Sequence, residues 1–69
     1  MKGAQIPAAD GHVYGVRCND GSVIHHWSGS TQREQAVVEL RACRALYPGD
    51  AFALVRRFPG EMAWTEVPG

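Results

Sequence analysis

Apolar and polar residues alternate with the two-residue period of a β-strand in two parts of the chain. The first part, residues 12–27, contains the turn sequence Asn-Asp-Gly at 19–21 and predicts a β-hairpin. The second part, residues 51–67, contains the turn dipeptide Pro59-Gly60 and predicts another hairpin. The pattern therefore predicts four strands, arranged as two hairpins.

Between the hairpins, residues 31–47 have the apolar period of an amphipathic helix. Thr31 and Glu34 match a capping box, in which the Thr hydroxyl accepts from a backbone N–H and Glu34 reaches back. Pro48 is predicted to end the helix. One apolar stripe is predicted to face the sheet: Ala36, Leu40, Cys43 and Tyr47. Charged residues separate it from a second apolar stripe: Val38, Ala42, Ala45 and Leu46.

One helix between two hairpins predicts an α+β fold. The expected architecture is a ββαββ two-layer sandwich, in which the helix packs on one face of an antiparallel sheet whose strand order the pattern leaves open. Residues 1–11 contain two Gly, one Pro and three Ala without apolar alternation. We therefore expect a flexible N-terminal arm over residues 1–11 and a single domain over residues 12–69.

The length of 69 residues leaves room for one domain and a small core. Seven Lys and Arg balance seven Asp and Glu, and the apolar content of 45% is ordinary for a folded chain. No run approaches the roughly 20 apolar residues of a membrane span, and the first residues lack the apolar stretch of a signal peptide. These features predict a soluble, cytoplasmic protein with no membrane partner.

Five residues are of types that bind metals: His12, Cys18, His25, His26 and Cys43. Their spacing does not match the closely spaced pairs of a zinc site, and adjacent histidines on a strand point to opposite faces. We therefore predict no metal site. We expect both cysteines to be free thiols, since no export signal takes the chain to an oxidising compartment.

Catalysis is not predicted either. A Cys–His pair oriented by Asp20 or Glu39 is conceivable, but no local motif supports it. The chain lacks a glycine-rich phosphate loop, and a four-stranded sheet with one helix leaves little interior for a pocket. We therefore expect a non-enzymatic protein with no cofactor and no small-molecule substrate.

The favoured hypothesis is a protein-interaction module that binds a protein partner or its own copy. The candidate surfaces are an open sheet face with Trp27 or Trp64 as an anchor, the second helix stripe, and the sheet edges. In the alternative interpretation both tryptophans belong to the core. The stripe is then only a helix rich in Ala, the best helix former.

The alternative function is nucleic-acid binding through an arginine-rich sheet face formed by Arg17, Arg56 and Arg57, with an aromatic neighbour. Zero net charge argues against it, because affinity depends on the number of phosphates neutralised. In the alternative interpretation the arginines alternate between the two faces and pair with Glu61, Glu66 or Asp20. Clustered arginines would favour nucleic acid, whereas arginines interleaved with acids around an apolar centre would favour protein.

The chain also shares several short sequence features with a group of known proteins. The resemblance covers residues 12–67 and rests on Tyr14-Gly15-Val16-Arg17-Cys18 with Asp20-Gly21, the Arg-rich helix, and Leu54-Val55-Arg56-Arg57 with Trp64-Thr65-Glu66-Val67. In these features the chain resembles small, mostly uncharacterised accessory proteins of actinobacterial phages and mobile elements. The resemblance implies a protein of the bacterial host cytoplasm that binds and redirects a host or phage component, or an early DNA-binding factor. It carries over no catalytic residue.

Overall fold

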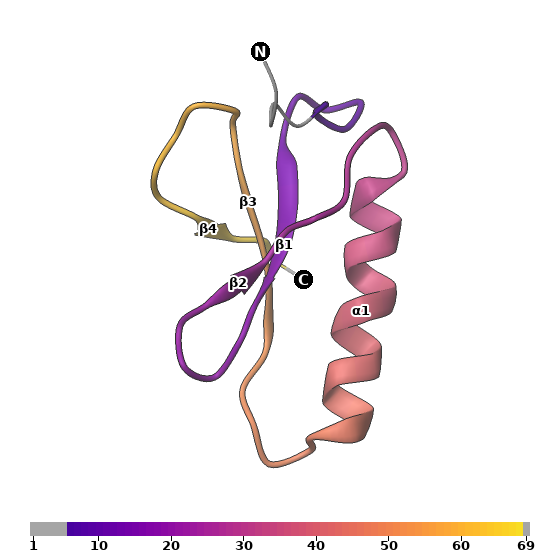
Figure 1. Cartoon of the computed structure of the whole chain (residues 1–69), viewed down its shortest axis with the longest axis vertical. Helices are drawn as coiled ribbons and strands as arrows, with labels where there is room; N and C mark the ends of the chain where they lie inside the picture. Colours follow the sequence, from indigo (N-terminus) through magenta and orange to yellow (C-terminus); the bar gives the residue numbers. More distant parts are fainter. Residues whose placement is uncertain (1–5, 69) are drawn as a thin grey trace.

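The computed structural model describes residues 6–68, which form one helix packed on one face of a four-stranded sheet (Figure 1). The elements follow the predicted ββαββ order, and the α+β prediction is confirmed. Their bounds are β1 Val13–Arg17, β2 Val23–Ile24, α1 Gln32–Leu46, β3 Ala53–Arg57 and β4 Thr65–Glu66.

The strand order, which the sequence left open, is β2-β1-β3-β4, and every neighbouring pair is antiparallel. Both predicted hairpins therefore form, and they join through the two longer strands, β1 and β3. The edge strands β2 and β4 have two residues each. Such short edges limit pairing with another chain.

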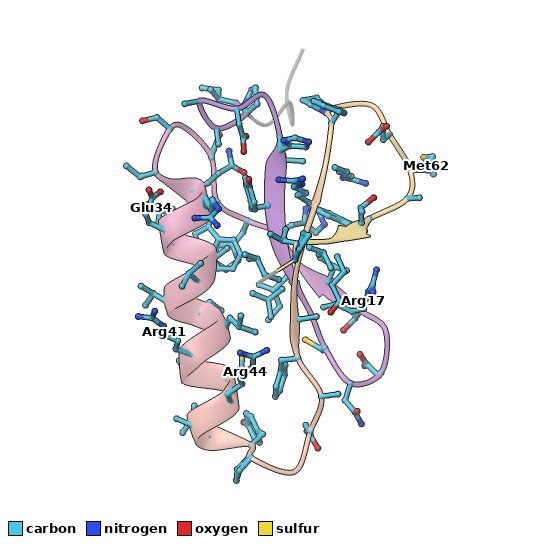
Figure 2. The ribbon with its side chains drawn as sticks, turned by 180° about the vertical axis from the view of Figure 1, so that it is seen from behind. Arg17, Glu34, Arg41, Arg44 and Met62 are labelled. Carbon is cyan, nitrogen blue, oxygen red and sulfur yellow. The ribbon has the colours of Figure 1, made fainter. Side chains whose placement is uncertain are left out.

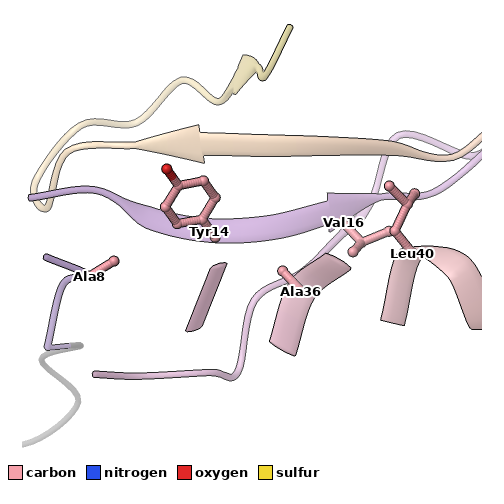
Figure 3. Packing of buried hydrophobic residues seen from close by; sticks show 5 residues of the cluster. All are labelled: Ala8, Tyr14, Val16, Ala36 and Leu40. Carbon is pink, nitrogen blue, oxygen red and sulfur yellow. The ribbon is translucent and has the colours of Figure 1, made fainter. Parts of the chain in front are cut away.

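The core lies between α1 and the central strands. Tyr14 and Val16, alternate residues of β1, are fully buried against Ala36 and Leu40 of α1 (Figure 3). Val16 of β1 pairs with Leu54 of the neighbouring strand β3, so both strands direct apolar side chains to the face covered by α1. Four partly buried side chains pack against the same cluster: Trp27, Phe52, Leu54 and Val67. The helix thus packs on the face of β1 that carries Tyr14 and Val16.

Two details of the predicted helix are wrong. Tyr47 is not buried with the rest of its stripe: it is the C-cap, its backbone at φ −131° has left the helix, and 57% of its surface is exposed. The capping box does not form, because Thr31, at φ −99° and ψ 7°, lacks the extended backbone of a capping residue. The Thr31 hydroxyl instead accepts a bond from Gln35 Nε2 at 3.2 Å.

Gln32 is fully buried and ties three segments together. Its Oε1 accepts from the backbone N–H of Tyr14 at 2.9 Å. Its Nε2 donates to the carbonyls of Ile6 at 2.6 Å and Gly29 at 3.2 Å. These bonds give partners to buried backbone groups that would otherwise lose hydration without replacement.

The packed fold begins before residue 12, where the sequence predicted the domain boundary. Ala8 is buried in the core. The backbone N–H of Ile6 donates to Ser28 Oγ at 2.9 Å, and that of Gly29 donates to the Ile6 carbonyl at 2.8 Å. Residues 6–11 thus belong to the domain, and the part of the predicted arm at residues 1–5 lies outside the described residues.

Candidate interaction surfaces

The outer face of α1, defined here as Val38, Ala42, Ala45 and Leu46, points away from the sheet and is exposed. Val38 keeps 66% of its surface in solvent and Leu46 keeps 71%. The stripe on the opposite side of the helix supplies the core, so the two predicted stripes have separate environments. An exposed apolar helix face is typical of a docking surface.

Charged residues border the outer face. Glu34 and Arg41 lie along one side of it and extend outward (Figure 2). Glu39 lies on the other side and accepts the Cys43 S–H at 3.6 Å. Acids and bases therefore alternate around an apolar centre, the arrangement expected of the rim of a protein interface.

A second surface, the cationic-aromatic cluster, consists of Arg17, Arg57, His25 and Trp64 on the sheet face opposite α1. The Arg57 guanidinium carbon lies 4.3 Å from the centre of the Trp64 ring, a cation–π contact. Arg17 Nη2 donates to the Trp64 carbonyl at 3.4 Å, and the His25 ring lies 5.2 Å from the Trp64 ring. The fold thus brings together residues that lie up to 47 positions apart.

Arg56 does not share this face. It follows Leu54 at the two-residue period of β3 and pairs with Tyr14 on the helix side of the sheet. There it opposes the rise in the pKa of Tyr14 that burial causes. The predicted arginine-rich face thus contains two of its three arginines, and Arg56 supports a core residue.

The apolar part of the sheet face opposite α1 is covered by the chain itself. Val13 and Val55 are buried there. A Cβ atom on Gly15 would lie 2.6 Å from Val23 Cγ1 and 2.9 Å from the Ile24 carbonyl, so residues 23–25 pass directly over this glycine. Trp27 packs on the helix side of the molecule instead. This sheet face therefore presents no open apolar patch with both tryptophans.

The charged side chains of the described residues form few ion pairs. Within residues 6–68, the one ion-pair contact joins His12 Nδ1 and Asp10 Oδ1 at 3.4 Å. The suggested partners of Arg56 and Arg57 bond elsewhere: Glu61 accepts from the Phe58 N–H, and Asp20 accepts from Ser22. No arginine of the described part of the chain is therefore neutralised by a carboxylate.

Asp10 and Gln32 are structurally important residues that the sequence analysis missed. The Tyr14 hydroxyl donates to the Asp10 carboxylate, and this bond is the main cause that lowers the pKa of Asp10. Burial is the main cause that raises the pKa of Tyr14. A signal for Gln32 was available, because it falls on the same side of the helix as Ala36 and Cys43, where a polar residue needs buried partners.

The described residues contain no group of three or more His, Cys, Asp or Glu that could hold a metal ion. Cys18 and Cys43 are free thiols, and burial raises the pKa of Cys43. A shallow hollow of about 380 Å³ lies beside Cys18, Tyr47 and Phe52. The helix within residues 6–68 is too short to cross a membrane.

Comparison with known proteins gives no relative: no protein-family model, no curated protein and no solved structure matches this chain.

Proposed function

We propose that this chain is a small, non-enzymatic protein-interaction module that docks through the outer face of α1. The observation that carries the proposal is the gathering of exposed apolar side chains on this helix. Val38 and Leu46 project into solvent from it, and the exposed Tyr47 follows directly. Burying such side chains against a partner removes apolar surface from water, which favours association.

The other candidate surfaces support protein docking less well. The edge strands β2 and β4 have two residues each and offer few backbone groups for strand addition. On the sheet face opposite α1, Val13 and Val55 are buried and residues 23–25 pass over Gly15. The outer face of α1 combines exposure, apolar side chains and a charged rim.

Matched substitutions test the proposal. Val38→Asp places a charge in the outer face, whereas Met62→Asp makes the same kind of change at a side chain that is 90% exposed in the loop before β4. We expect Val38→Asp to abolish both self-association and capture of a partner protein, while Met62→Asp leaves them intact. Binding that survives Val38→Asp, or a chain that associates with nothing, would overturn the proposal.

The cationic-aromatic cluster supports a second candidate, weak binding of single-stranded nucleic acid. Arg17 and Arg57 have no carboxylate partner within residues 6–68, and Trp64 supplies an aromatic ring between them. Fluorescence anisotropy with a labelled oligonucleotide would show salt-dependent binding that Arg17→Ala with Arg57→Ala removes and Arg33→Ala keeps. Absence of binding at low salt would exclude this function. The phage origin implied by the resemblance stays a prediction.

A further inference from the structure

We infer that the partner of the outer face is a second copy of this chain, with the two α1 helices antiparallel and Glu34 of each copy beside Arg41 of the other. This inference rests on the proposed function, because it names the partner of the same face. The inference is supported by the opposite charges of Glu34 and Arg41 along the helix and by the exposed Val38 side chain between them.

Glu34 and Arg41 lie seven residues apart, which is about two turns, so they lie on the same side of α1. Figure 2 shows both extending outward from that side. Both are exposed, and neither has an ion-pair partner within residues 6–68. Each is therefore available to an opposite charge outside its own chain.

This charge order is complementary to itself in one direction only. In a parallel pair related by a two-fold axis, the borders that carry Glu34 and Arg41 lie on opposite sides of the interface, so these two charges do not meet. An antiparallel pair related by a two-fold axis sets Glu34 beside the partner's Arg41 and forms the same contact twice. Antiparallel helix dipoles also attract.

The axis implied by these two contacts passes through the apolar part of the face. The midpoint between positions 34 and 41 falls between Val37 and Val38, so the exposed Val38 meets its own copy at the centre. Ala42 lies level with position 33 of the partner helix, and its small side chain allows the two helices to approach closely there. Ala45 and Leu46 lie level with positions 30 and 29 of the partner, just before its helix begins at Gln32.

A charge swap tests this arrangement. Sedimentation velocity over a concentration series would measure the dimer dissociation constant of the unmodified chain and of each variant. We expect Glu34→Arg or Arg41→Glu to weaken the dimer by about tenfold or more, because symmetry applies each repulsion twice. The double variant Glu34→Arg with Arg41→Glu restores the contacts and the dimer. Arg33→Glu makes a matched charge change on the same helix but outside the outer face, and it leaves the dimer intact.

The outcomes separate this inference from the proposed function. A chain that stays monomeric at every concentration overturns the inference, and capture of another protein through Val38 then decides the proposed function. A dimer that Val38→Asp breaks but the charge swap does not affect overturns the antiparallel arrangement and leaves docking through the outer face standing. A dimer indifferent to Val38→Asp contradicts both. Circular dichroism of every variant confirms that a lost dimer is not a lost fold.

Discussion

The two sides of α1 have similar apolar residues and opposite environments. Ala36, Leu40 and Cys43 are buried against the sheet, whereas Val38 and Leu46 are exposed on the other side. Hydrophobicity therefore does not explain which side is buried. The difference is that β1 and β3 present Tyr14, Val16 and other apolar side chains to one side of the helix only.

The inner side also has a polar anchor that the outer side lacks. Gln32 bonds to the backbone of β1 and to the segments around Ile6 and Gly29. A buried amide with these partners fixes the rotation of the helix, because turning α1 would leave polar groups unpaired. The outer side has the border charges Glu34 and Arg41, which suit a surface that associates reversibly.

The largest expected difference between the two sides is the effect of truncation on stability. Leu40→Ala removes a core side chain and should lower the free energy of unfolding by about 2–5 kcal/mol. Val38→Ala should change it by less than about 0.5 kcal/mol, because Val38 has few contacts within the monomer. Urea unfolding at a protein concentration at which the chain is monomeric measures both free-energy changes. Equal losses would contradict the distinction between the two sides.

Removing the polar anchor should have the next largest effect. Gln32→Ala leaves the buried N–H of Tyr14 without its partner, a loss of about 1–3 kcal/mol for an unsatisfied buried group. Gln35→Ala, three residues along the same helix, removes an exposed bond to Thr31 and should cost little. If thermal unfolding gave the same midpoint for both variants, Gln32 would not be an anchor.

The reactivity of the two thiols tests how well the inner side of α1 is protected from solvent. Cys43 is buried on the inner side of α1, and its burial together with the bond to Glu39 raises its pKa. Cys18 is only half-buried beside a shallow hollow. With a disulfide reagent, Cys43 in the Cys18→Ser variant should react about tenfold or more slowly than Cys18 in the Cys43→Ser variant. Equal rates would show that the inner side opens readily.

The smallest expected effect is a dependence of stability on acidity through Asp10, which holds the core residue Tyr14. Its pKa lies below the ordinary 3.8 in the folded chain. The contribution is therefore fully present above pH 3.8 and is lost as the pH falls through the lower folded value. It should stay below about 1 kcal/mol, because solvent screens this exposed carboxylate. Asp10→Asn should flatten the acid limb of a stability–pH curve, and an unchanged acid limb would contradict this role of Asp10.

Several features of the fold were predictable because they depend on residues near one another in the chain. The two-residue period that begins at His12 predicted a strand where β1 forms. The separation of the helix stripes identified the exposed positions of the outer face. The two helix predictions that were wrong depend on backbone geometry at the ends of the helix, where Tyr47 leaves the helix and Thr31 is not extended.

The candidate sites were less predictable than the elements. The contact of Arg57 with Trp64 needs the Phe58–Trp64 connection to fold back over the sheet, and the placement of residues 23–25 over Gly15 needs β2 to pair closely with β1. Neither feature has a local signature. The sequence could only name the arginines and tryptophans as candidates, and alternation along β3 separated Arg56 from Arg57.

The sequence by itself determined the number, order and apolar faces of the elements, because backbone periodicity and turn chemistry act over a few residues. The tertiary structure alone decided the β2-β1-β3-β4 order, the burial of Gln32, the packing of residues 6–11 and the meeting of Arg17 with Trp64. These features depend on contacts between distant segments. Such contacts form only when burial and hydrogen bonding together outweigh the entropy lost in bringing the segments together.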